Sequence, residues 1–279
     1  MKVLVTGVSG QLGFDVMREL LARGIEAKGA SRSDFSLTDF AAMRRFVEAH
    51  RPTAIIHCAA YTAVDKAEDE PELCREVNAA ATGELARLAK EIGAKFLYIS
   101  TDYVFPGTGE DFYEPEDEKA PCNVYGESKL LGEEAALEAL EELFIVRISW
   151  VFGENGKNFI KTMLRLAETH EELSVVGDQI GSPTYTRDLA RLLADMIVTE
   201  KYGVYHATNE GTCSWAELAE EALRCAGKKT RVKAIKTEEY PTKAKRPKNS
   251  RLSKKCLDDA GFSRLPDWRD AVARYVELI

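Results

Sequence analysis

The stretch Lys2-Val-Leu-Val-Thr-Gly7-Val-Ser-Gly10-Gln-Leu-Gly13 decides the fold class, because an apolar strand runs directly into a glycine-rich turn. The turn is followed by an amphipathic segment that we predict to be a helix over 11–23. Glycine lets the backbone approach a pyrophosphate closely, and a helix N-terminus offers unpaired N–H groups and a positive dipole end. A glycine-rich loop without a ligand is the alternative. The position directly after the first strand favours a dinucleotide site.

The alternation of short apolar runs with amphipathic stretches continues to residue 150. We predict strands over 2–6, 25–30, 54–58, 95–100 and 143–149 and helices over 11–23, 39–50, 71–92 and around Tyr125. This alternation is typical of the α/β class, and it predicts a doubly wound parallel Rossmann sheet. Right-handed crossovers place the carboxyl ends of such strands along one edge, where ligands bind.

Beyond Trp150 the alternation becomes less regular. We predict helices near 158–170, 186–198, 214–225 and 267–279, and strands near 173–176 and 204–206. Residues 1–150 are therefore interpreted as a dinucleotide-binding Rossmann domain that is continued by elements within about 173–206. The remaining segments of 151–279 are interpreted mainly as a smaller C-terminal α/β lobe that binds the substrate. Residues 228–255 are rich in Lys and Arg, so this segment is either a solvated surface or part of a site for an anionic substrate.

Composition excludes several classes of function. The 279 residues carry a formal net charge of −8, which argues against nucleic acid as a partner. No apolar run approaches the roughly eighteen residues of a membrane span, and the first apolar run ends at Thr6, too early for a secretory signal. The six cysteines form no C-x-x-C pair and the four histidines show no metal-ligand spacing. We expect a cytoplasmic protein with reduced thiols and no metal.

Tyr125 and Lys129 form the most informative polar pair. Residues at i and i+4 share a helix face, so a phenol and an ammonium group at these positions can point into one cleft. A nearby cation favours the phenolate and brings the pKa of a tyrosine toward the range useful for proton transfer. A solvated lysine beside a half-buried ring is the alternative when the pair is considered alone. The glycine-rich turn upstream favours a redox enzyme that uses Tyr125 as its proton donor.

The choice of cofactor depends on the end of the second predicted strand. An acidic residue there binds the 2′-hydroxyl of NAD, whereas an arginine accommodates the extra phosphate of NADP. The chain has Ser31 and Arg32 at this position and no acid before Asp34. We therefore predict NADP(H) as the preferred cofactor and NAD(H) as a weaker one. An exposed loop charge is the alternative role for Arg32.

Seven motifs spread over the chain resemble one known family. They are Gly-Gln-Leu-Gly (10–13), Tyr-Thr-Ala-Val-Asp-Lys-Ala-Glu (61–68), Ser-Thr-Asp-Tyr-Val-Phe (100–105), Asn-Val-Tyr-Gly-Glu-Ser-Lys (123–129), Arg-Ile-Ser-Trp-Val-Phe-Gly (147–153), Gly-Asp-Gln-Ile-Gly-Ser-Pro-Thr (177–184) and Arg-Pro-Lys-Asn-Ser-Arg-Leu (246–252). In these motifs the chain resembles the extended short-chain dehydrogenases/reductases and, within them, the dTDP-4-dehydrorhamnose reductase family.

The resemblance implies roles for individual residues. Positions that would contact the cofactor, beside Gly7, Gly13, Ser31 and Arg32, are Gly10, Gln11, Leu12, Ser36, Leu37, Ala60, Tyr61 and Thr62. Tyr125 and Lys129 would be the catalytic pair and would also contact the cofactor, with Thr101 in place of the usual catalytic serine. Thr101, Asp102 and Trp150 would contact the sugar nucleotide. A loop cap, a turn residue and a core tryptophan are the respective alternatives.

The resemblance also implies an activity, namely NADPH-dependent reduction of the 4-keto group of a nucleotide-linked deoxysugar. The first choice of substrate is dTDP-4-dehydro-L-rhamnose, which gives dTDP-L-rhamnose, and another reductase or epimerase of this fold is an alternative. A 4,6-dehydratase requires an Asp-Glu pair after the threonine, where this chain has Asp102-Tyr103. A non-catalytic NADP-binding subunit, similar to the beta subunit of methionine adenosyltransferase, stays open.

The family often forms homodimers, so a homodimer is expected here. Some members bind Mg²⁺ through acidic residues at the dimer contact. Asp15 matches that pattern, but Arg187 stands where another acid is expected. No metal is therefore predicted.

Overall fold

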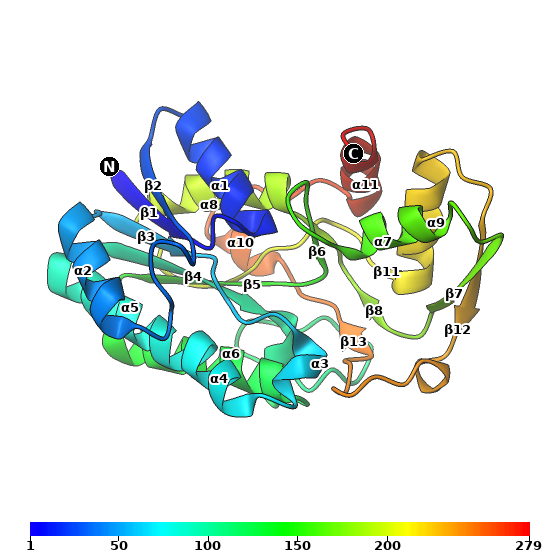
Figure 1. Cartoon of the computed structure of the whole chain (residues 1–279), viewed down its shortest axis with the longest axis horizontal. Coiled ribbons are helices and arrows are strands. Elements are labelled where there is room, and N and C mark those ends of the chain that lie inside the picture. The colour runs from blue at the N-terminus through cyan, green and yellow to red at the C-terminus, as the bar shows by residue number, and fades with distance from the viewer.

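The computed structural model describes residues 1–279 and is built around a parallel six-stranded sheet (Figure 1). The strand order is β2 (Glu26–Ala30), β1 (Lys2–Thr6), β3 (Ala54–His57), β4 (Lys95–Thr101), β5 (Leu143–Ile148) and β10 (Gly203–His206). The order reverses between β1 and β3, which creates the switch point where ligands bind in such sheets. The predicted doubly wound Rossmann sheet is confirmed.

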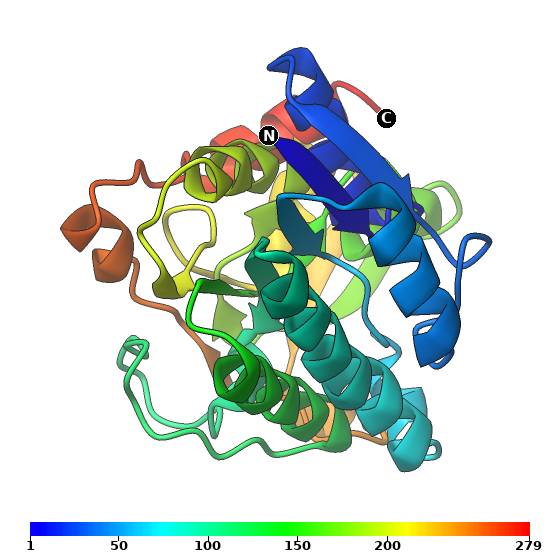
Figure 2. The same ribbon diagram turned by 90° about the vertical axis from the view of Figure 1, so that its left-hand side faces the viewer.

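Helices cover both faces of the sheet. On one face, α1 (Gln11–Ala22) and α8 (Thr186–Ile197) pack together over the sheet. On the other, α2 (Phe40–His50), α5 (Ala81–Ile92) and α6 (Val124–Ala139) form a second core, and Figure 2 shows α5 and α6 side by side. Leu4 and Ile55 face this second core, whereas Val3 and Val5 face the first, because side chains alternate along a strand.

The helix predicted over 71–92 has three parts. It begins as α4 (Pro71–Arg75), continues through a π-helical turn (Glu76–Ala80) and ends as α5, where Gly93 adopts a φ of 66°. Short helical elements that the sequence pattern did not predict precede and follow it, namely α3 (Val64–Ala67) and a 3₁₀ turn (Asp102–Val104). Elements of three or four residues are too short to show a periodicity.

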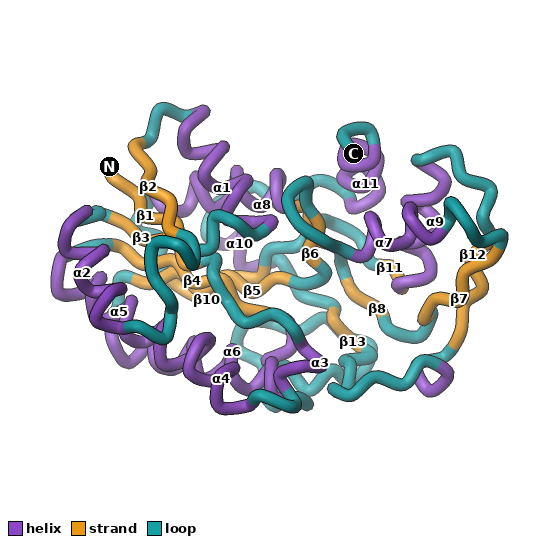
Figure 3. Tube along the Cα trace, viewed as in Figure 1, coloured by secondary structure: helices purple, strands orange, loops and turns teal.

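A smaller lobe contains most of the remaining chain, and Figure 3 shows its short strands among loops. Its strands are β6 (Val151–Phe152) paired with β9 (Thr184–Tyr185), β7 (Glu172–Val176) paired with β12 (Arg231–Ile235), and β8 (Ile180–Gly181) between β11 (Cys213–Ser214) and β13 (Asn249–Ser250). Its helices are α7 (Phe159–Leu166), α9 (Trp215–Cys225) and α11 (Trp268–Val276), and a 3₁₀ turn lies at Thr237–Glu239. The lobe has its own apolar cores around Trp268 and Leu223.

The C-terminal half contributes to both parts. Within the range 173–206, predicted to continue the Rossmann domain, β10 extends the main sheet and α8 packs on α1. Residues 173–176 of this range instead pair with β12 in the lobe. Only Leu173 and Val175 of β7 are fully buried, as in a strand covered on one face. Leu257 of α10 (Lys255–Asp259) joins the core of the main sheet. The structure contains no candidate membrane-spanning helix.

Candidate active site

The glycine turn after β1 is shaped for close backbone approach. Gly7 has a φ of 72°, and a Cβ at this position would lie 2.8 Å from the backbone of Ala59. A Cβ on Gly13 would collide with the carbonyl group of Gly7. Gly10 is the N-cap of α1 and supplies no side-chain cap, so Gln11 and Leu12 begin the helix beside an open N-terminus. These residues fit a bound pyrophosphate.

Residues 31–37 at the end of β2 differ from an NAD-selective site. The Ser31 N–H and hydroxyl groups both donate to the Asp34 carboxylate, at 2.8 and 2.9 Å, and these bonds lower the pKa of Asp34. The carboxylate is thus bound within its own turn. Arg32 is exposed and makes no hydrogen bond or ion pair, as expected of a group that can bind a phosphate. Ser36 is exposed nearby, while Leu37 packs against the core under α2.

The loop after β3 contains Ala60, Tyr61 and Thr62 and is held by a residue that we did not predict. Asn78, in the π-helical turn, accepts from the Tyr61 N–H at 2.8 Å and donates to the Tyr61 carbonyl at 3.1 Å. The same amide donates to the Ser128 hydroxyl of α6 at 2.9 Å. Asn78 is fully buried, and its role arises from these contacts between distant segments, so no pattern in the sequence indicated it.

Thr101 and Asp102 lie at the end of β4 and are 5% and 3% exposed. The Thr101 hydroxyl donates to Oδ1 of Asp102 at 3.0 Å, whereas Oδ2 is buried without a hydrogen-bond partner. Burial raises the pKa of Asp102 to about 6, although interactions with Ser250 and Thr101 oppose this shift. A buried carboxyl oxygen without a partner is costly, and such groups are typical of functional sites.

The helix α6 begins at the Asn123 cap, whose side chain accepts from the Gly126 N–H at 2.8 Å. Tyr125 lies in its first turn, partly exposed, with the ring of Tyr103 edge-on at 5.6 Å between centroids. Desolvation raises the pKa of Tyr125, and the nearby Thr101 hydroxyl opposes this shift by hydrogen bonding. The structure therefore brings Tyr125 and Thr101 together.

Lys129 lies on the same face of α6 and is 2% exposed. Its ammonium group donates to the Ile99 carbonyl at 2.7 Å and lies 4.1 Å from the centre of the Tyr98 ring. It makes no hydrogen bond to Tyr125, and burial raises the pKa of that phenol, contrary to the lowering expected from the spacing of the two residues. Burial lowers the pKa of Lys129 to about 7, so this group gains or loses its proton near neutral pH.

Trp150 follows β5 and has a φ of 49°, a left-handed conformation that is rare outside glycine. Its ring stacks on Trp215 of the lobe, with centroids 3.8 Å apart and an angle of 15°. A Cβ on Gly181 would lie 2.9 Å from the indole. Backbone strain of this kind is typical of functional sites.

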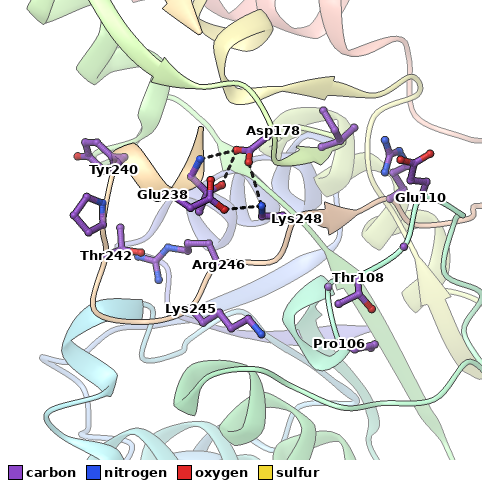
Figure 4. Close-up of a pocket in the computed structure, with 16 residues that line it drawn as sticks. Pro106, Thr108, Glu110, Asp178, Glu238, Tyr240, Thr242, Lys245, Arg246 and Lys248 are labelled. Carbon is purple, nitrogen blue, oxygen red and sulfur yellow. Dashed lines mark hydrogen bonds and ion pairs between the residues drawn. The ribbon is translucent and has the colours of Figure 1, made fainter. Parts of the chain in front are cut away.

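A cavity of about 750 Å³ lies between the loop after the 3₁₀ turn at Asp102–Val104 and segments of the lobe (Figure 4). Its walls come from residues 106–110, from Asp178 and Ile180, and from the basic segment between 237 and 251. Lys248 lies between Asp178 and Glu238, at 3.3 and 2.8 Å. Lys245 and Arg251 have no carboxylate partner. Both are therefore available to an anion.

The Asp15 region contains mixed charges. Asp15 is buried, accepts from the Thr186 hydroxyl at 2.5 Å and lies 3.2 Å from Arg18. Arg187 pairs with Glu154 at 2.5 Å. The structure contains no group of three or more His, Cys, Asp or Glu residues that could hold a metal.

Comparisons with known proteins agree with this geometry. The family model described as RmlD substrate binding domain matches residues 1–279. The spore coat polysaccharide biosynthesis protein SpsK of Bacillus subtilis is 40% identical over 99% of this chain and 97% of its own length. The dTDP-4-dehydrorhamnose reductase of Burkholderia thailandensis is 40% identical over 98% of this chain and 97% of its own.

A solved structure extends the comparison to the fold. The dTDP-4-dehydrorhamnose reductase of Bacillus anthracis, in complex with NADP, is 41% identical, and the match covers 100% of both chains with a TM-score of 0.97. The match of the family model and the full-length relatives show that the chain belongs to the RmlD substrate binding domain family, which includes the dTDP-4-dehydrorhamnose reductases among the extended short-chain dehydrogenases/reductases.

Proposed function

We propose that this protein is an NADPH-dependent oxidoreductase that reduces the 4-keto group of dTDP-4-dehydro-L-rhamnose to give dTDP-L-rhamnose. The observation that carries the proposal is the meeting of the Tyr125 and Thr101 hydroxyls at the end of β4, with Lys129 one turn further along α6. The full-length relatives named dTDP-4-dehydrorhamnose reductase support the choice of substrate.

Each residue of the site has its own role in the reduction. A bound NADPH supplies the hydride that adds to the carbonyl carbon. Tyr125 donates its proton to the carbonyl oxygen as negative charge develops there, and the Thr101 hydroxyl donates a hydrogen bond to the same oxygen. Lys129, one helical turn further along α6, holds the ribose hydroxyls with its ammonium group.

NADPH is the preferred cofactor, with NADH as a weaker one. The glycine turn binds the pyrophosphate through Gly7, Gly10, Gln11, Leu12 and Gly13. Arg32 and Ser31 receive the 2′-phosphate, and this role is supported by the exposed, unpaired Arg32 and by the NADP of the Bacillus anthracis relative. Further cofactor contacts come from residues in the two loops after β2 and β3, namely Ser36, Leu37, Ala60, Tyr61 and Thr62.

The sugar nucleotide lies between the two parts of the chain. Thr101, Asp102 and Trp150 contact the sugar, and the diphosphate lies in the adjoining cavity near Lys245 and Arg251, which are its free cations. Residues 1–150, together with α8 and β10, thus form the cofactor half. The other segments of 151–279 form mainly the substrate half.

Following NADPH absorbance with dTDP-4-dehydro-L-rhamnose made in situ tests the function. We expect substrate-dependent loss of the NADPH absorbance and formation of dTDP-L-rhamnose. Absence of turnover with this and other 4-keto sugar nucleotides would refute the proposal. The non-catalytic subunit is not favoured, because the relatives that match over the full length include several named dTDP-4-dehydrorhamnose reductase.

We further propose that the enzyme works in the cytoplasm as a homodimer, as the family resemblance implies. Sedimentation equilibrium on the purified chain, with and without EDTA, tests the assembly. A monomer at micromolar concentration would contradict it.

A further inference from the structure

One ion pair in the structure has both side chains almost fully buried. It joins Glu133 of α6, 3% exposed, to Arg147 of β5, 2% exposed. The pair is bidentate, because Arg147 Nε donates to Oε1 at 2.9 Å and Nη2 donates to Oε2 at 2.7 Å. Desolvation makes such a pair a weak source of stability, and apolar residues often serve as well. A role other than stability therefore has to be considered.

The pair lies directly behind the proposed catalytic residues. Glu133 is four residues after Lys129, which is four residues after Tyr125, so the three share one face of α6. The Glu133 carboxylate also accepts a hydrogen bond from the Ser100 hydroxyl, one residue before Thr101. Arg147 is fixed in turn, because its Nη1 donates to the Pro115 carbonyl at 2.8 Å. The Glu133 carboxylate thus links α6, which carries Tyr125 and Lys129, to β4, which ends at Thr101.

The other titratable groups around the Lys129 ammonium are neutral near pH 7. Burial lowers the pKa of His57 to about 3 and raises the pKa values of the thiols and phenols, leaving them protonated. These groups come from the end of β3, α4, β4 and α6: His57, Cys58, Cys74, Tyr98 and Tyr125. Glu133 is the one anionic group that acts on Lys129.

We propose that Glu133, held by Arg147, is a positioning residue that keeps Lys129 protonated and fixes the Ser100–Thr101 end of β4. This inference rests on the proposed reduction, in which Lys129 acts as a cation. Burial draws the pKa of Lys129 down to about 7, and the negative charge of Glu133 opposes that effect. Without Glu133 the lysine would lose its proton at a lower pH, and the activity that needs the ammonium form would be lost with it.

The variant Glu133→Gln tests this role, with Glu134→Gln as the matched control, because Glu134 is the exposed neighbour without an ion pair. The titration of Lys129 is followed by NMR of protein with ¹⁵N in its lysine side chains, assigned with Lys129→Met. We expect its midpoint to fall by about one pH unit in Glu133→Gln, the low end for a close opposite charge. The alkaline limb of kcat should move by the same amount, and neither should move in Glu134→Gln.

Arg147 left alone in the core could prevent Glu133→Gln from folding. The double variant Glu133→Gln, Arg147→Gln removes both charges, and it should show the same direction of shift because Glu133 is the group that acts on Lys129. An unchanged Lys129 midpoint in a folded variant overturns the proposal, even if the melting temperature or kcat is lower. If the wild type reduces no 4-keto sugar nucleotide, the proposed function fails, while the NMR midpoint still decides the effect of Glu133 on Lys129.

Discussion

The phenol of Tyr125 lies near the Thr101 hydroxyl and is the proposed proton donor to the substrate oxygen. Tyr125→Phe keeps the ring and its edge contact with Tyr103 but removes that proton. We expect kcat to fall at least about a hundredfold, the low end for general acid catalysis. The dissociation constant for NADPH should change little, which fluorescence titration can measure. Tyr202→Phe, in the core beside Phe144, is the control; near-normal turnover of Tyr125→Phe would exclude the assignment.

Arg32 decides the preference between the two nicotinamide cofactors, if it binds the 2′-phosphate as proposed. Its side chain is exposed and unpaired, so Arg32→Ala should leave the stability of the fold unchanged. One charge-assisted hydrogen bond corresponds to about a tenfold loss in kcat/KM with NADPH, with little change for NADH. Steady-state kinetics with both cofactors checks the ratio. Arg45→Ala, an exposed arginine of α2, should leave it unchanged, and so should Arg32→Ala if Arg32 is only a loop charge.

Asp102 makes the stability of the protein depend on pH. Its pKa in the folded chain is about 6, above the usual value of about 4 that it has when unfolded. The folded state therefore holds a proton longer, and stability is lost as pH rises through about 6. Asp102→Asn stays neutral, so its stability relative to the wild type should increase by up to about 3 kcal/mol between pH 4 and 7.

Urea unfolding at several pH values measures that difference. Asp111→Asn, an exposed carboxylate, serves as the control and should show no such trend. A difference between Asp102→Asn and wild type that is constant across this range would mean that Asp102 is ionised throughout.

At the scale of secondary-structure elements, the sequence predicts the helices and strands that have a clear hydrophobic period or a capping residue. The predicted starts near 39, 158, 214 and 267 coincide with Asp39, Asn158, Ser214 and Asp267, whose side chains accept from N–H groups of the first turn. The strands β6, β8, β9, β11 and β13 are two residues long, so no alternation could reveal them. β12 lies in the segment rich in lysine and arginine and shows no apolar run, because none of its side chains is fully buried.

The residues of the candidate site likewise divide into those that the sequence could place and those that it could not. Residues at the ends of predicted strands, such as Thr101, could be placed at one edge by topology alone. Asn78, Glu133 and Arg147 could not, because their roles arise from contacts with residues up to 59 positions away that no local pattern encodes. The contact of Lys129 with the Ile99 carbonyl is of this kind as well. Residue types and topology thus predict where a site lies, and packing decides which partner each group has.

At the scale of the whole molecule, a segment of the C-terminal half is attached to the helices beside the main sheet. Residues 240–248 leave the lobe and run past α3 and the start of α6 before they enter β13 (Figure 1). Asp65 of α3 accepts from the Ala244 N–H at 3.0 Å and from Arg246 at 2.6 Å. Asn123, the cap of α6, donates to the Lys245 carbonyl at 2.8 Å. This segment also forms a wall of the 750 Å³ cavity, so its attachment sets the shape of the proposed site for the sugar nucleotide.

Asp65→Ala should therefore weaken binding of the sugar nucleotide more than binding of the cofactor. It removes both hydrogen bonds that hold Ala244 and Arg246, and two such bonds correspond to roughly a tenfold or greater rise in KM for the sugar nucleotide. The glycine turn is not part of this attachment, so the dissociation constant for NADPH should stay within about twofold. Asp69→Ala is the matched control, because its ion pair with Lys243 is about half exposed on both sides and such surface pairs contribute little. An unchanged KM for the sugar nucleotide in Asp65→Ala, or a parallel loss of NADPH affinity, would show that the attachment through Asp65 does not shape the proposed substrate site.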